Sequence, residues 1–86
     1  MRRYSDTPPW QAVLNARHMP IEANVGRETS IPVAAFVNFE WDGWTLLEGL
    51  CDRWYGKLVH VRIADKRIAG QSVGLHAMDV RRLRRS

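Results

Sequence analysis

The chain has 86 residues, of which 45% are hydrophobic and 26% are charged, and its formal net charge is +4. This length and balance predict one small globular domain over 1–86, with flexible ends at 1–6 and 84–86, and exclude a largely disordered chain. A domain of this size has a small core and little room for a buried multi-residue active site. We therefore expect a binding protein rather than an enzyme.

The positive charge is concentrated at the two ends of the chain. Residues 4–80 hold seven basic residues and all nine acidic residues, which gives this body a net charge of −2. The remaining basic residues are Arg2, Arg3, Arg81, Arg82, Arg84 and Arg85. The sequence therefore does not predict a uniformly cationic groove for nucleic acid.

The sequence contains no pattern for a membrane segment, a metal site or a cofactor. No apolar run approaches the ~18 residues that cross a bilayer, and no apolar region follows the first arginines as it would in a signal peptide. Cys51 is the only cysteine, which excludes an internal disulfide and a four-cysteine zinc site. The expectation is a cytoplasmic protein without a membrane partner, a metal or a cofactor.

The first segment with a clear pattern is compatible with two structures. Thr7 is a suitable N-cap and Pro8 suits the first helical position, so a short helix over 8–18 is favoured. Alternation of apolar residues from Trp10 to Ala16 leaves a strand open as the alternative. A short strand is predicted next, over 21–25.

The clearest strand pattern covers 32–41, where Val33 to Trp41 alternate on one face. Asp42-Gly43 predicts a two-residue hairpin turn, since glycine tolerates the positive φ of a type I′ turn. A second strand over 44–53 follows. This hairpin would make Trp41 and Trp44 a cross-strand pair with their rings on one face.

The remaining residues predict further short elements and a small barrel. They are a strand at 58–64, a strand interrupted by glycines at 67–75, a helical turn at 76–79 and a closing strand at 80–85. Four to five short antiparallel strands joined by tight turns predict a mainly β fold that curls into a small barrel. Glycines within the runs suit its sharp bends.

The segment VNFEWDGWTLLEGLCD, residues 37–52, resembles the first half of an Sm-like motif, with an acidic-Gly turn, a bending glycine and a closing aspartate. The helical turn predicted before the closing strand resembles the one found in SH3-like barrels. Together the two resemblances imply an SH3-like or Sm-like barrel. The chain departs from the Sm pattern in the five residues between Gly43 and Gly49, one more than usual, and in lacking the base-binding Asn within DRWYGK. The resemblance implies an RNA-facing loop at Arg53, Trp54 and Tyr55.

The leading functional interpretation is a nucleic-acid-associated or regulatory module. Aromatic rings beside cations, as in DRWYGK and ADKR, are typical of loops that stack bases and contact phosphate. RNA or DNA would be held with weak base specificity, and the terminal arginines would add affinity. The predicted contact residues are Arg53, Trp54, Tyr55, Lys57, Arg62, Lys66, Arg67, Arg81, Arg82, Arg84 and Arg85.

The alternative is a protein–protein interaction module, an adaptor or assembly domain. Its contact residues would be the acidic-aromatic patch of Trp41, Trp44, Glu40 and Asp42, which suits a basic or proline-containing partner. These rings are equally compatible with a role in the core of so small a domain. Homo-oligomerisation through strand edges is compatible with both interpretations. Catalysis by Cys51 and His60 is disfavoured, because His60 shares a predicted strand face with Arg62.

Overall fold

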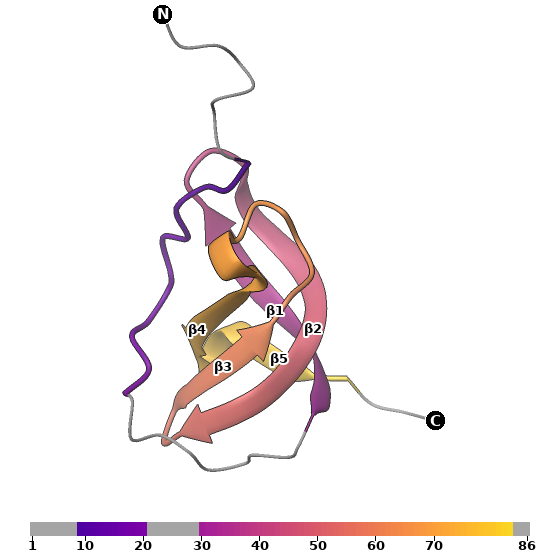
Figure 1. Cartoon of the computed structure of the whole chain (residues 1–86). Coiled ribbons are helices and arrows are strands. Elements are labelled where there is room, and N and C mark those ends of the chain that lie inside the picture. Colours follow the sequence, from indigo (N-terminus) through magenta and orange to yellow (C-terminus); the bar gives the residue numbers. More distant parts are fainter. Residues whose placement is uncertain (1–8, 21–29, 84–86) are drawn as a thin grey trace, which may run out of the picture.

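The computed structural model describes residues 9–20 and 30–83, which form one antiparallel sheet of five strands (Figure 1). The strands are β1 Ile31–Phe39, β2 Gly43–Tyr55, β3 Leu58–Arg62, β4 Ser72–His76 and β5 Val80–Arg82. Two short 3-10 turns, η2 Ala69–Gln71 and η3 Ala77–Asp79, precede β4 and β5. The spatial order is β4-β3-β2-β1-β5. The predicted mainly β fold and the helical turn before the closing strand are confirmed.

Strand β1 forms where β-branched and small apolar residues alternate between two faces. Val33, Ala35, Val37 and Phe39 are at most 3% exposed, and the residues that alternate with them are turned to the opposite face. The whole strand pairs with β2, from Ile31 opposite Cys51 to Phe39 opposite Gly43. The strand predicted over 32–41 is confirmed, with its end two residues earlier than expected.

The turn between β1 and β2 differs from the predicted two-residue hairpin. Because Phe39 pairs with Gly43, the three residues between them form the connection, and Gly43 adopts a φ of 75°. Trp44 therefore pairs with Asn38. The predicted cross-strand pair of Trp41 and Trp44 is wrong, because the wider turn places Trp41 in the loop rather than in the paired region.

Strand β2 is long and curls across the sheet, pairing with β1 through its first part and with β3 through its last part (Figure 1). A side chain at Gly49 would place its Cβ 2.5 Å from the carbonyl oxygen of Arg62 and 3.0 Å from Val61. Glycine at this position therefore permits the close approach of β2 to β3. The pairing register shifts between Cys51 and Arg53, which adds a second irregularity to the bend.

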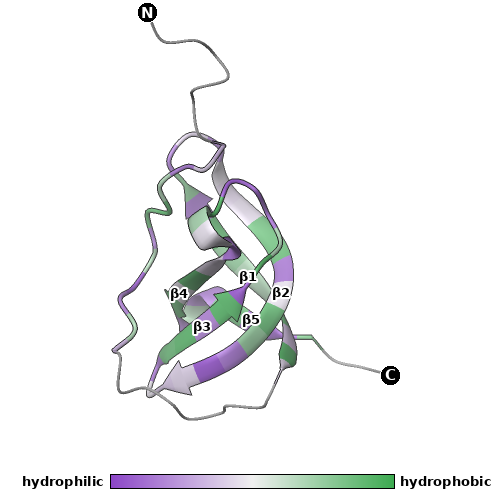
Figure 2. Ribbon diagram, viewed as in Figure 1, coloured by the Kyte–Doolittle hydropathy of each residue, from purple (hydrophilic) through white to green (hydrophobic). Residues whose placement is uncertain are grey.

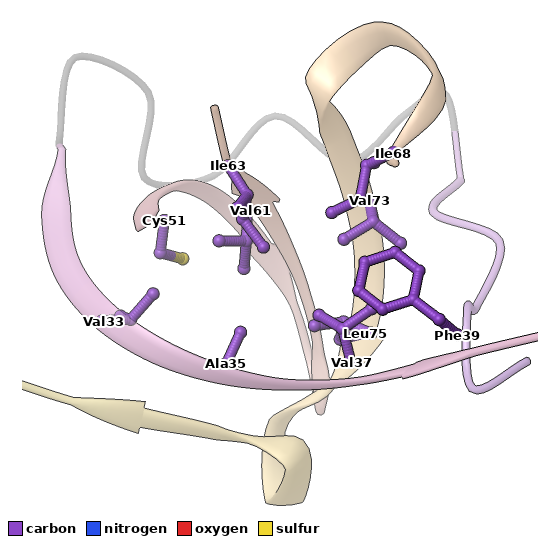
Figure 3. Packing of buried hydrophobic residues seen from close by; sticks show 10 residues of the cluster. All are labelled: Val33, Ala35, Val37, Phe39, Cys51, Val61, Ile63, Ile68, Val73 and Leu75. Carbon is purple, nitrogen blue, oxygen red and sulfur yellow. The ribbon is translucent and has the colours of Figure 1, made fainter. Parts of the chain in front are cut away.

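The core lies inside this curl, with Cys51 near one end and Phe39 at the other (Figure 3). Its members are Val33, Ala35, Val37, Phe39, Cys51, Val61, Ile63, Ile68, Val73 and Leu75. No polar or charged residue is buried in the part of the chain that the structure describes. Green apolar residues recur along the strands, with purple polar residues between them on β2 (Figure 2). Burial of apolar surface is therefore the main source of stability.

Residues 9–20 form an extended strap rather than a helix. Val13 forms an isolated bridge with Phe39, and Leu14 donates its backbone N–H to the carbonyl of Asn38 at 2.7 Å. Further along the strap, the backbone N–H of Arg17 donates to the carbonyl oxygen of Gly74 at 2.8 Å. The predicted helix over 8–18 is wrong within the described residues, because hydrogen bonds to two strands replace the local ones of a helix. The strand predicted at 21–25 lies outside the described residues.

The five strands do not close into a barrel, since β4 and β5 remain the two edges of the sheet. The strap runs along one side of the sheet, in contact with the end of β1 and, further along the strap, with β4 (Figure 1). At these two places the backbone of the strap forms hydrogen bonds that a neighbouring strand would form in a closed sheet.

Replacement of Gly49 by alanine should destabilise the domain by about 1–3 kcal/mol, because the added methyl meets backbone at a packed crossing. Glu48→Ala, one residue away on the exposed face, is the matched control and should change the free energy of unfolding by at most about 0.5 kcal/mol. Urea denaturation of both variants measures the difference. Equal stability of the two variants would contradict the proposed role of Gly49.

Candidate functional site

An apolar surface covers the outward faces of β1 and β2. Trp44 and Leu46 are 61% and 57% exposed, and Leu50 is 38% exposed. In the register, Phe36 lies opposite Leu46 and Pro32 lies opposite Leu50, so these side chains share one face of the sheet. We call Pro32, Phe36, Trp44, Leu46 and Leu50 the outer patch.

Charged residues lie within the outer patch and beside it. Glu48 is exposed between Leu46 and Leu50, and its cross-strand neighbour is the small residue Ala34. Ala34 in turn pairs with Arg81 of β5 on the same face. Within the described residues Glu48 forms no salt bridge, so its carboxylate is available to a cation from a partner.

The turn that carries Trp41 is held by the strap. The side-chain oxygen of Gln11 accepts hydrogen bonds from the backbone N–H groups of Trp41 and Asp42, at 3.1 and 3.2 Å. The Gln11 amide nitrogen donates to the Asp42 carboxylate at 3.0 Å. Trp41 is 70% exposed and Glu40 is also exposed on this turn. The acidic-aromatic residues predicted to bind protein are thus at the surface, on a turn fixed by side-chain hydrogen bonds.

Arg67 belongs to the framework of the fold. Its guanidinium donates to both carboxylate oxygens of Asp65, at 2.9 and 2.8 Å, and to Asp42 at 2.9 Å. It also lies 4.4 Å above the centroid of the Phe39 ring. All three guanidinium nitrogens are therefore engaged, and the hydrogen bonds from Arg67 lower the pKa of the Asp42 and Asp65 carboxyls. Arg67 joins the β1–β2 turn to the loop after β3 instead of presenting a free cation.

The two rings predicted to stack on bases are directed to opposite faces. Trp54 is half-buried and packs against the core, where it lies opposite Val59 of β3. Tyr55 is 52% exposed. Both rings belong to the end of β2, and the turn begins at Gly56, so strand alternation separates them.

The other predicted cations are dispersed over the fold. Arg53 is half-buried on β2, and Lys57 is exposed in the β2–β3 turn. Lys66 is exposed beyond the opposite end of β3, and Arg81 is exposed on β5. Arg84 and Arg85 lie outside the described residues. The structure thus does not gather the predicted basic residues into one groove.

Asp52, at the shift in register, forms a small polar cluster on β2 and β3. Its carboxylate lies 2.7 Å from Nδ1 of His60 and 3.5 Å from Nε of Arg62. The Arg62 cation is therefore partly neutralised within the fold. The His60 side chain is 18% exposed, less than the alternation predicts, because this contact holds it against Asp52.

Cys51 lacks the surroundings of a nucleophile. Its thiol is buried with the core, and burial raises the pKa of the thiol, which keeps it protonated. Cys51 pairs with Val61, one position away from His60, so the two side chains occupy opposite faces of the sheet. Across residues 9–20 and 30–83, no three His, Cys, Asp or Glu residues form a group that could hold a metal ion. The same residues include no helix long and apolar enough to span a membrane.

The outer patch was not identified from the sequence, although a signal for it was present. Large apolar residues occupy both faces of β2, as the adjacent Leu46 and Leu47 illustrate. An edge or half-buried strand with one solvated face would be polar on that face. A second apolar face on a strand of a small domain is therefore an indication of a contact surface.

Removal of the Arg67 cation should make the stability of the domain depend less on pH in the acid range. Hydrogen bonds from Arg67 hold the pKa of both aspartates below the usual carboxyl range in the folded protein. Their contribution to stability is therefore present above the unfolded pKa and is lost as the pH falls through the folded pKa. Arg67→Met keeps an apolar chain over Phe39 but removes the hydrogen bonds. Thermal denaturation between about pH 6 and pH 2 should show a flatter profile for Arg67→Met than for the native protein. Arg62→Met is the matched control, and an unchanged profile for Arg67→Met would refute the assignment.

Comparison of the chain with protein-family models, with curated proteins and with solved structures finds no match.

Proposed function

We propose that this domain is a non-enzymatic protein-interaction module with an SH3-like architecture, which docks a partner on the outer patch. The architecture is supported by the curled β2 shared between two halves of the sheet, by the pairing of β5 with β1, and by η3 immediately before β5. Full closure of the barrel is not part of the proposal, because β4 and β5 do not pair with each other and remain the two edges of the sheet.

The observation that carries the proposal is the exposure of Trp44 and Leu46 on one continuous face. Exposed apolar groups that are contiguous mark contact surfaces in soluble domains, whereas single ones need no explanation. Tryptophan is enriched among residues that dominate binding energy, where its ring fills a pocket of the partner. The patch lies on two strands that are paired along their whole shared length, so its backbone is already ordered before docking.

The charges around the patch indicate the chemistry of the partner. Glu48 at the centre, with Glu40 and Trp41 on the neighbouring turn, favours a segment that alternates apolar residues with a lysine or arginine. The basic residues Arg62 and Arg81 flank the patch, so a partner that is cationic throughout would be repelled at its margins. A short apolar segment with one central cation fits this arrangement best.

Two sets of synthetic peptides with the same apolar positions, one with a central arginine and one with a central glutamate, test the proposal by fluorescence anisotropy. We expect the arginine set to bind more tightly, and Trp44→Ala to weaken binding at least tenfold, since an aromatic anchor contributes about 2 kcal/mol or more. Because Trp44 is exposed, this variant should fold normally. Met78→Ala, which removes an 80% exposed apolar side chain elsewhere, should leave binding unchanged. Peptide binding that survives Trp44→Ala would argue against the outer patch.

Nucleic-acid binding is a second candidate function, favoured by the exposed Tyr55 two residues before the exposed Lys57. A stacked ring and a phosphate contact at this turn would bind a single strand weakly and without base specificity. Copies of the chain that associate through strand edges would multiply such contacts.

Anisotropy with single-stranded RNA, single-stranded DNA and duplex DNA, each at low and moderate salt, tests this second function. Affinity should fall steeply with salt and weaken on Tyr55→Ala. The contribution of the C-terminal arginines is tested with Arg81→Gln. Removal of residues 81–86 is unsuitable for this purpose, because it would delete two of the three residues of β5. If no nucleic acid binds even at low salt, this function is excluded.

A further inference from the structure

A second surface feature lies on the inward side of the sheet, remote from the outer patch. It is an apolar pocket of about 310 Å³ between the first residues of β1, the last part of β2, and β5. The lining includes Ile31, Cys51, Trp54, Val59 and Val80, together with one charged residue, Arg82. Cys51 lies at this end of the core, away from Phe39 (Figure 3). The volume lies at the lower end of the range for small-molecule sites.

The strand register explains why a cation is found here. Arg82 pairs with Val33, a core residue that is 3% exposed, and it alternates with the outward-facing Arg81. Arg82 therefore occupies an inward position of β5, beside Val80, at the rim of an apolar cavity. An apolar residue at this position would extend the core, so an arginine is an exception to the pattern of the sheet.

No acidic side chain neutralises Arg82 within the part of the chain that the structure describes, in contrast to Arg62 and Arg67. Arg82 is exposed on β5, so its guanidinium reaches solvent at the mouth of the pocket, where it is available to an anion. Its planar fork matches the two oxygens of a carboxylate. The pocket thus combines an apolar volume with a single anion-binding group at its mouth.

We propose that this pocket binds a small amphipathic carboxylate, with its apolar chain against Trp54 and Val59 and its carboxylate paired with Arg82. The small volume limits the occupant to a short acyl chain or a single ring. Cys51 contributes an apolar wall to the site, because its protonated thiol packs as a small hydrophobic group. The site is separate from the outer patch, so a ligand and a protein partner would bind opposite faces of the same sheet.

Titration of the full chain with octanoate, octan-1-ol and octylammonium, followed by two-dimensional NMR of backbone amides, tests the proposal. Octanoate should shift the signals of Cys51, Val59 and Val80 in a saturable manner, and octylammonium should not. Arg82→Gln should weaken octanoate binding about tenfold and leave octan-1-ol binding unchanged, since one charge-assisted contact is lost. Arg81→Gln, the neighbouring outward-facing arginine, should change neither.

A measurement on the native protein gives an independent readout. Cys51 is the only cysteine, so its rate of alkylation by iodoacetamide at constant pH reports on the pocket alone. Saturating octanoate should slow this reaction severalfold. The proposal is overturned if octanoate shifts only residues of the outer patch, if it does not bind, if Arg82→Gln behaves as Arg81→Gln does, or if alkylation is not slowed.

Discussion

The curl of β2 is the constraint on which the rest of the structure depends. A flat five-stranded sheet of this length would leave its apolar face in water, whereas the curl brings the strands on either side of β2 together around one core. The curl requires close contact between β2 and β3, and Gly49 provides it because no Cβ stands between the strands. The register shift after Cys51 completes the bend. With no buried polar network in the described part, shape and apolar packing hold the sheet in this form.

Outside the core, a few polar contacts determine how the loops are placed. Arg67 connects Asp42 and Asp65 and lies over Phe39, so the guanidinium joins two loops to the core that they cover. The strap adds backbone hydrogen bonds to β1 and β4. These contacts also explain why a count of basic residues overstates the cationic surface, since a paired arginine contributes little to attraction for phosphate.

The two faces of the sheet present different surfaces. The outward side of β1 and β2 carries the exposed apolar residues of the outer patch, the surface on which we propose that a protein partner docks. The inward side carries an open apolar pocket with Arg82 at its rim, the site that we propose for a small carboxylate. Cys51 lies in the core beside this pocket, where burial raises the pKa of its thiol.

The sequence by itself determined the β class, the positions of the strands that make up most of the sheet and the helical turn before β5, because period-2 alternation and turn residues act locally. It also determined that Cys51 is an apolar member of the core. Only the tertiary structure decided that residues 9–20 are a strap, because their hydrogen-bond partners lie on distant strands. The same holds for the separation of Trp54 from Tyr55 and for the pairing of Arg67. Which aromatic or charged side chain reaches solvent depends on register and on partners far away in the chain, and local patterns carry no information on either.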